Sequence, residues 1–316
     1  MMQIVLVGIG AGVAAALLFA SVSSGVLLSV LLFYLAPLPV MIAALGWSHW
    51  SGLVAALTAA ACLGLVFGGL FFLAFLLGVA VPAWWLSYLA LLGRPAANGQ
   101  LEWYPPGRLV LWAAVLGALI IAVALMSYGA DEHAIRASLR AALERLLRLQ
   151  DGPVALPGVT DPDRLIELMA AVLPPMAALV AAITQIFNLW LAGRVVKLSG
   201  LLRRPWPDLS AMTFPPLAAA ALAVAVAGTI IPDLPGTIAS LFAATLALAF
   251  TILGFAFLHA ATRNIAGRPF MLAGVYGFVL ILGWPALVIA LVGVGETLFH
   301  WRTRLGKHGP PALPGG

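Results

Sequence analysis

Charged residues are scarce in this chain. Only 9% of its 316 residues are Asp, Glu, Lys or Arg, whereas 63% are apolar. A soluble domain is about 25% charged and about 45–50% apolar, and a soluble fold could neither bury this much apolar surface nor cover its exterior with so few charges. The composition therefore excludes an ordinary water-soluble enzyme and an intrinsically disordered chain. It indicates a polytopic helical membrane protein that lies in a lipid bilayer, in agreement with the mean hydropathy of +1.10.

Cysteine and lysine are almost missing. The single cysteine, Cys62, excludes an intramolecular disulfide, and within an apolar run it is expected to behave as a small hydrophobe. Lysine occurs only at Lys197 and Lys307, so most of the 16 basic residues are arginines, set against 11 acidic residues. In a membrane protein this excess indicates loops held on the cytoplasmic side, and it gives no reason to expect nucleic acid as a partner.

Sequence signatures of catalysis are also missing. The chain has no phosphate-cradling loop of the G-x-x-x-x-G-K type, no H-E-x-x-H and no paired cysteines. No two of its five histidines have the spacing of metal ligands on one helix face. We therefore expect no catalytic residue, no metal and no cofactor, and we do not expect an enzyme.

Long apolar runs dominate what remains. A helix needs roughly 20 mostly apolar residues to cross the bilayer, and eight runs approach or reach this length: 4–20, 26–45, 52–67, 70–92, 109–127, 176–191, 216–231 and 237–258. A last block, Phe270–Phe299, is interrupted by Gly283-Trp284-Pro285 and is either one tilted span or a hairpin of two short helices. The expected fold is an all-α transmembrane bundle of about 8–10 spans.

Residues 129–175 form the only stretch with soluble character. Ile135, Leu139 and Leu143 recur at the spacing of one helical face, while Arg136 and Arg140 lie on another. This pattern predicts an amphipathic helix, either packed against the bundle or lying in the membrane interface. A second helix is predicted from residue 163 to about residue 173, ending at the two prolines that follow.

These features divide the chain into four parts. Residues 1–128 are expected to form a five-span bundle, 129–175 the helical insertion, 176–303 a second membrane bundle and 304–316 a flexible tail.

The orientation follows from the basic residues. The stretch from Gly193 to Ser210 is the strongest cytoplasmic signal, because it carries four of them: Arg194, Lys197, Arg203 and Arg204. Counting spans from this loop places the N-terminus in the cytoplasm as well. The basic C-terminal tail favours the same side, and therefore favours the hairpin interpretation of the last block. The expected location is the cell inner membrane.

The first predicted span carries small residues at helical spacing. Gly8 and Gly12 form a G-x-x-x-G, and Ala16 with Ala20 forms an A-x-x-x-A pair. Such spacing lets helix backbones approach closely in lipid. The face is either used for packing within the chain or is a docking face for a membrane protein partner.

Polar residues inside spans are costly and therefore informative. Gln185 and Asn188, three residues apart, share one helix face. They predict either hydrogen bonds between helices or a polar patch on a substrate or ion pathway. Tyr34 precedes two prolines that interrupt the second span, which is either a kink or a broken helix that lines a site.

Two further polar residues lie near the ends of predicted spans. His259 closes the eighth span and is expected at the membrane interface next to Arg263. Glu296 is expected at the interface, paired with Arg302 or Arg304; if it is buried, it would be a proton or cation site.

Several short elements follow one another in a characteristic order: Asn188-Leu-Trp-Leu-Ala-Gly-Arg194, Arg204-Pro-Trp-Pro207, Phe214-Pro-Pro216, Gly254-Phe-Ala-Phe-Leu-His259 and Gly293-Val-Gly-Glu296. In this order they resemble the YybS-like family of uncharacterised bacterial membrane proteins, a domain of unknown function. The resemblance implies a membrane location and a helical architecture, but no reaction. The small residues of the first span give a fainter likeness to the substrate-capture subunits of energy-coupling-factor transporters.

Two functions are compatible with these features. The first is a multi-pass inner-membrane protein that binds or transports a small or amphiphilic solute between its helices. The second is a scaffold that transports nothing and recruits partners to the membrane. The identity of a small-molecule ligand cannot be read from the residues.

Overall fold

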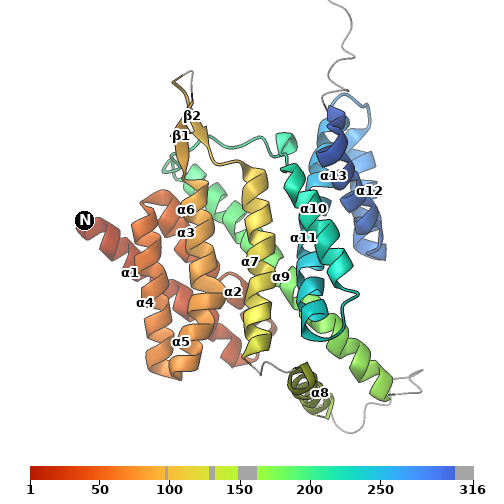
Figure 1. The fold of residues 1–316 in the computed structure, drawn as a ribbon. Coiled ribbons are helices and arrows are strands. Elements are labelled where there is room, and N and C mark those ends of the chain that lie inside the picture. Colours follow the sequence, from red (N-terminus) through yellow and green to blue (C-terminus); the bar gives the residue numbers. More distant parts are fainter. Residues whose placement is uncertain (97–98, 128–131, 149–161, 303–316) are drawn as a thin grey trace, which may run out of the picture.

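The fold is almost entirely helical. The computed structural model describes residues 1–96, 99–127, 132–148 and 162–302, and confirms the expected all-α bundle (Figure 1). Two short strands, β1 (Gly93–Pro95) and β2 (Leu101–Trp103), form an antiparallel hairpin in which Arg94 is opposite Glu102. The α-helices are α1 (Met2–Ala20), α2 (Leu27–Tyr34), α3 (Pro37–Gly46), α4 (His49–Phe67), α5 (Gly69–Phe75), α6 (Val81–Ala90), α7 (Pro106–Met126), α8 (Glu132–Arg148), α9 (Pro162–Leu198), α10 (Pro216–Gly228), α11 (Asp233–Ala261), α12 (Arg268–Leu282) and α13 (Pro285–Phe299).

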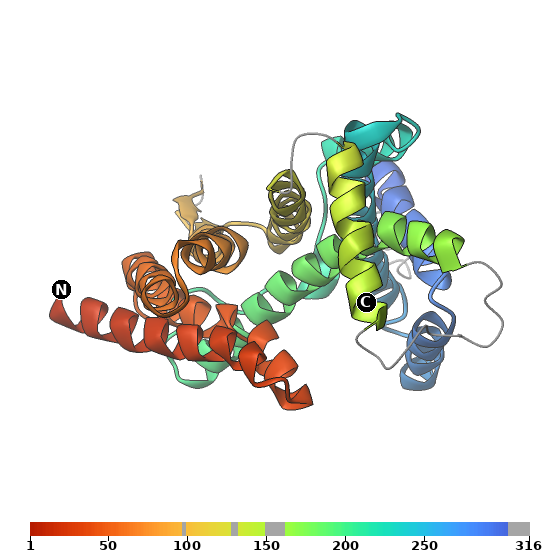
Figure 2. The same cartoon turned by 90° about the horizontal axis from the view of Figure 1, so that it is seen from below.

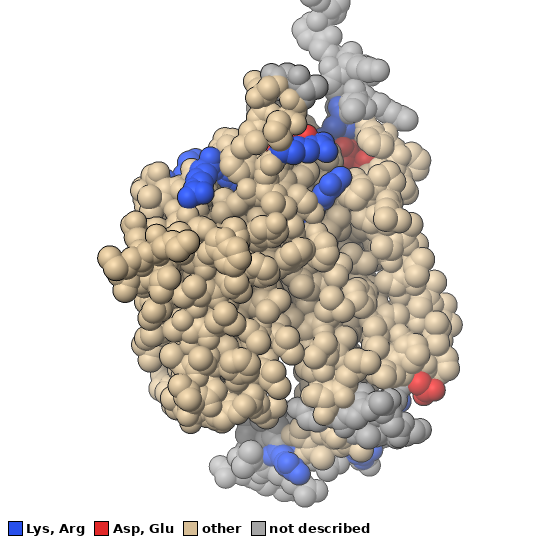
Figure 3. All heavy atoms as spheres, turned by 60° about the vertical axis from the view of Figure 1, so that its left-hand side comes forward, with Lys and Arg blue, Asp and Glu red and all other residues tan. Residues whose placement is uncertain are grey.

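Seven helical segments of the described chain are long and apolar enough to cross a membrane. Three helices, α10, α12 and α13, are apolar but shorter, with 13, 15 and 15 residues. Figure 3 shows the consequence on one face of the molecule: the charged residues lie at the two ends, and a broad band without charge lies between them. This is the surface expected of a protein that lies in a lipid bilayer.

Prolines and glycines interrupt the helices where the sequence predicts. The second span breaks into α2 and α3 at residues 35–36, because Pro37 and Pro39 have no N–H to donate within the helix. Gly68 adopts a φ of +95° and separates α4 from α5 by a tight turn. The 76–80 segment, a π-helical turn, joins α5 to α6.

The helices form two halves joined by a long diagonal helix. Figure 2 shows the first half, α1–α6, and the second half, α10–α13, on opposite sides, with α7 and α9 between them. α9 packs against α3 on one side and against α7 and α11 on the other. Alanine dominates the buried residues of both halves, and small side chains let helix backbones approach closely in lipid.

α9 corrects one prediction. The helix expected to end at Pro174–Pro175 does not end there; the chain stays helical for 37 residues through both prolines. In lipid, a backbone that leaves the helix finds no water to bond, so continuing the helix costs less than breaking it. The domain boundary predicted at residue 175 falls inside α9.

α8, the amphipathic helix of the insertion, lies across one end of the bundle. In Figure 1 it is seen end-on, whereas α7 is seen lengthwise, so α8 runs across the direction of α7. Leu143 is buried, and Leu139 packs against a cluster of α7, α9 and α11 residues. The helix therefore packs on the bundle through its apolar face.

The last apolar block is a pair of helices, as the charge pattern favours. Gly283, with a φ of +71°, ends α12, and α13 begins at Pro285. Arg302, just after α13, donates to the carbonyl oxygen of Met212 at 2.9 Å. The chain thus returns to the end of the molecule where Arg263 pairs with Asp208, and the single-span alternative is excluded.

Candidate functional site

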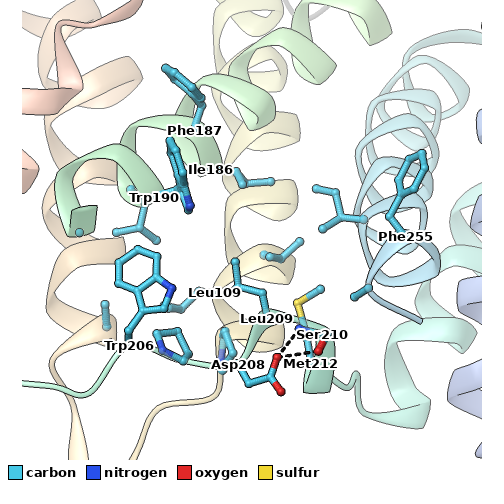
Figure 4. Close-up of a pocket in the computed structure, with 18 of the residues that line it drawn as sticks. Leu109, Ile186, Phe187, Trp190, Trp206, Asp208, Leu209, Ser210, Met212 and Phe255 are labelled. Carbon is cyan, nitrogen blue, oxygen red and sulfur yellow. Dashed lines mark hydrogen bonds between the residues drawn. The ribbon is translucent and has the colours of Figure 1, made fainter. Parts of the chain in front are cut away.

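A cleft of about 950 Å³ lies between the two halves. α7 and α9 line one side of it, and α11 and α12 line the other. Figure 4 shows Ile186, Phe187 and Trp190 of α9 on one side and Phe255 of α11 on the other. Most of the lining is aliphatic or aromatic, so the cleft offers an apolar surface to a ligand.

The connecting loop, residues 199–215, closes one end of the cleft and is attached to the first half by two arginines. Arg203 Nη2 donates to the carbonyl oxygen of Trp47 at 2.8 Å, and Arg204 Nη1 donates to that of Ala90 at 2.9 Å. Both carbonyls lie at helix C-termini, where backbone acceptors lack helical partners and a positive charge is favourable. Burial lowers the pKa of Arg204, which nevertheless stays charged.

The same loop is attached to the second half by Asp208. Its carboxylate lies 2.7 Å from Arg263 Nη2 and accepts hydrogen bonds from the backbone N–H and hydroxyl of Ser210. The hydrogen bond from Ser210 and then that from Arg263 lower the pKa of Asp208 to about 2. The loop therefore contacts both halves at this end of the cleft.

Trp206 anchors the middle of the connecting loop. The guanidinium of Arg194 and the ammonium of Lys197 lie 5.4 and 5.3 Å from the centre of its rings. These are cation–π distances, and the indole also lines the cleft. The four basic residues predicted to face the cytoplasm therefore all make contacts within the protein at the closed end of the cleft.

A polar group from α11 and α12 completes this end. Arg268 Nη2 lies 3.2 Å from His259 Nδ1, and His259 Nε2 lies 2.9 Å from the hydroxyl of Tyr276. The ring of Tyr276 stacks on that of Phe255, with 4.5 Å between centres. His259 lines the cleft, and its side-chain contacts are Arg268 and Tyr276, not the neighbouring Arg263 that the sequence predicts.

Asn188 of α9 contacts Tyr34 at the end of α2. The Asn188 amide, fully buried, donates to the carbonyl oxygens of Tyr34 and Thr184 at 2.9 and 2.8 Å. The break after α2 leaves the Tyr34 carbonyl without its helical partner, and Asn188 supplies one. Both residues line a smaller cleft of about 270 Å³. Gln185 is 2% exposed and lines neither cleft.

Both α9 amides keep an acceptor without a partner. Within the part of the chain that the structure describes, neither Gln185 Oε1 nor Asn188 Oδ1 accepts a hydrogen bond. Because Asn188 Nδ2 donates to two carbonyls, the orientation of this amide is well determined.

Glu296 lies away from both clefts. It is 5% exposed, its Oε1 is 3.3 Å from Arg302 Nε, and its Oε2 accepts from the Arg302 backbone N–H at 3.2 Å. Arg302 is one of the two partners that the sequence predicts. The pair fixes the chain reversal after α13, so Glu296 has a structural contact of its own.

The small-residue face of α1 is occupied within the chain. A Cβ at Gly8 would meet Val54, and one at Gly12 would meet Thr58 and the carbonyl oxygen of Ala55, all on α4. Ala16 is buried on the same helix and Ala20 is half-buried. This is the packing that such spacing permits.

The cleft residues that sequence reasoning missed include Phe187, Trp190, Arg268 and Tyr276. One signal was available for the first two, because large aromatic residues three apart on a long span make a continuous helix face. Nothing in the sequence indicates that Arg268 and Tyr276 lie beside His259, since this depends on how α12 folds back on α11.

The residues of the described chain include no group of three or more His, Cys, Asp or Glu side chains that could hold a metal ion. Fold and cleft together define a multi-pass helical membrane protein with an apolar cleft between two halves.

Residues 12–295 match the family described as "Predicted membrane protein (DUF2232)", and the chain belongs to this family. Its function is unknown, as the resemblance in the sequence implied. No curated protein and no solved structure matches the chain.

Proposed function

We propose that this protein binds an amphiphilic solute, a molecule with an apolar chain and a polar headgroup, in the cleft between its two halves. The observation that carries the proposal is the uneven distribution of polarity along the cleft. Its walls are apolar, and its polar side chains belong to the connecting loop and to the His259, Arg268 and Tyr276 group. The proposed role is binding of the solute. Transport requires in addition that the two halves move apart and release it.

The size of the cleft supports this proposal. Its volume of about 950 Å³ is at the upper end of the range for ligand pockets, which is about 300–1,000 Å³. Ile183, Phe187 and Trp190 line it and are still 49, 49 and 44% exposed. Such large side chains along a cleft offer an apolar chain a continuous contact surface.

Filling the cleft tests the proposal. Ile183→Trp adds a bulky ring on the α9 side, and we expect it to weaken binding of a 16-carbon amphiphile at least about tenfold, since lost apolar contact of about 1.4 kcal/mol has this effect. Binding is measured with purified protein in phosphatidylcholine nanodiscs and radiolabelled palmitate.

Met176→Trp is the matched control. Met176 lies seven residues earlier on α9, is also 49% exposed, and lines neither cleft. We expect it to bind palmitate like the unmodified protein. Equal binding by both variants would contradict the proposal.

We also propose that the protein lies in the cell inner membrane with the connecting loop in the cytoplasm. Arg194, Lys197, Arg203 and Arg204 support this orientation, because short loops rich in Lys and Arg are retained on the cytoplasmic side. The headgroup end of the cleft would then face the cell interior.

A further inference from the structure

The acidic residues of the loop end of the molecule are all paired. Outside residues 131–167, the sequence has only four: Glu102, Asp208, Asp233 and Glu296. Asp233 begins α11, at the end of that helix opposite to His259. The other three pair with Arg94, Arg263 and Arg302 at 2.8, 2.7 and 3.3 Å.

Two cationic side chains line the cleft at this end: Arg204 and Arg268. Neither has a carboxylate partner in the described chain, and the acidic residues nearby are already engaged. Asp208, the acidic residue of the cleft lining, is neutralised by Arg263. The polar end of the cleft therefore carries an uncompensated positive charge.

Arg268 has hydrogen-bonding capacity to spare. A guanidinium has five N–H donors in a planar fork. Its Nη2 is engaged by the side chain and the carbonyl oxygen of His259, at 3.2 and 3.3 Å. Its Nε is buried and has no acceptor among the described residues. The Arg268 side chain lines the cleft, so an anionic group bound there would accept from the donors of the guanidinium that remain.

His259 directs a second donor to the same place. Arg268 can only donate, so His259 Nδ1 accepts, and in the neutral imidazole the proton is on Nε2. This nitrogen donates to the Tyr276 oxygen at 2.9 Å. The hydroxyl proton of Tyr276 is then available to a ligand, because the oxygen is already used as an acceptor.

We propose that the headgroup bound by this cleft is anionic, a phosphate or a carboxylate, and that Arg268 binds it. Arg268 and the Tyr276 hydroxyl donate to the headgroup, His259 holds both in position, and Arg204 adds positive charge. The apolar chain lies along Phe187, Trp190 and Phe255. This inference rests on the proposed function and specifies its ligand class.

Three ligands with one chain length test the inference: hexadecyl phosphate, palmitate and the neutral hexadecanol. Each is measured on the full chain in phosphatidylcholine nanodiscs, with inorganic phosphate as a fourth probe. We expect the two anions to bind at least about tenfold more tightly than hexadecanol, the difference that one charge-assisted hydrogen bond makes. In Arg268→Gln this preference should fall to about twofold or less.

Arg203→Gln is the matched control. It removes one positive charge from the same end of the molecule, but Arg203 donates to the carbonyl of Trp47 and does not line the cleft. The preference for anions should persist in this variant. A variant that does not fold would be recognised by its loss of helical circular dichroism. In that case Arg268→Lys is used, which keeps the positive charge but loses the planar guanidinium; its preference for anions over hexadecanol should lie between those of the unmodified protein and of a protein without the charge.

The outcomes separate the two proposals. If hexadecanol binds as tightly as the anions, or if the preference for anions is unchanged in Arg268→Gln, the proposal of an anionic headgroup is overturned. The proposal that the cleft binds an amphiphile is then unaffected. Inorganic phosphate binding as tightly as hexadecyl phosphate overturns the amphiphile as the ligand class. If none of the three 16-carbon ligands binds, the proposed function itself is overturned.

Discussion

Asn188 shows at the residue scale how a polar side chain stabilises a broken helix. Its amide bonds the carbonyl of Tyr34, which the α2–α3 break leaves without a helical partner, and that of Thr184 on its own helix. An interhelical hydrogen bond in lipid contributes about 0.6 kcal/mol on average and about 1–2 kcal/mol in favourable cases. Asn188 is therefore a structural residue, whether or not the smaller cleft beside it holds a ligand.

Replacing Asn188 should lower stability. We expect Asn188→Leu to reduce the free energy of unfolding by about 1–2 kcal/mol, because the Tyr34 carbonyl is then buried without a donor. Unfolding is followed by circular dichroism as sodium dodecyl sulfate is added to micelles of a neutral detergent.

Gln185→Leu is the matched control, one turn earlier on α9. The Gln185 oxygen has no partner in the described chain, so an apolar residue of similar size removes an unmet acceptor and should leave stability unchanged or raise it. If Gln185→Leu lowers the free energy of unfolding as much as Asn188→Leu does, the effect comes from replacing any buried amide of α9 and not from losing the hydrogen bond to Tyr34.

At the scale of elements, the contact between α11 and α13 depends on glycine. A Cβ at Gly254 would overlap the carbonyl oxygen of Ile289, and one at Gly293 would overlap that of Phe250. Thr251 also donates to the carbonyl of Ala286 at 3.2 Å across the same contact. The two helices approach so closely that backbone atoms of one meet the surface of the other.

Adding one methyl group at this contact should force the helices apart. We expect Gly254→Ala to destabilise the protein by about 1–3 kcal/mol, the usual cost of overpacking, in the same detergent titration.

Gly274→Ala on α12 gives the comparison, since no atom of the described chain lies within 4 Å of its added Cβ. There the better helix propensity of alanine should be neutral or stabilise by up to about 1 kcal/mol. Equal effects at both positions would show that α11 and α13 do not meet as described.

At the scale of the whole molecule, the two halves are held together at one end by the connecting loop. Arg203 and Arg204 attach it to α3 and α6, Asp208 attaches it to Arg263, and the Met212 carbonyl accepts from Arg302. These contacts gather the basic loop, the C-terminal end of α13 and the polar end of the cleft on one side of the apolar band.

Labelling of introduced cysteines tests the orientation of this whole assembly. In a Cys62→Ala background, Ser199→Cys is on the connecting loop and Thr229→Cys is in the turn between α10 and α11; both positions are exposed. A thiol reagent that does not cross membranes should label Thr229→Cys in intact cells and Ser199→Cys only after the membrane is opened. The reverse pattern would invert the proposed orientation.

The sequence alone determined the membrane-spanning character of the chain and the interruption of the second span near Pro37, and it limited the partner of Glu296 to Arg302 or Arg304. These follow from short stretches of chain: the length of an apolar run measured against the bilayer, the missing N–H of proline, and an acid with an arginine six residues away. Each is decided by neighbours in sequence and by the lipid.

Only the tertiary structure decided the continuity of α9 through Pro174 and Pro175 and the position of the cleft. It also decided the meeting of Arg268 with His259 and Tyr276. In lipid, apolar side chains face both the bilayer and the bundle, so the sequence does not indicate which face of a helix packs inward. The arrangement of helices in space settles that, and with it the end of the cleft where the positive charge lies.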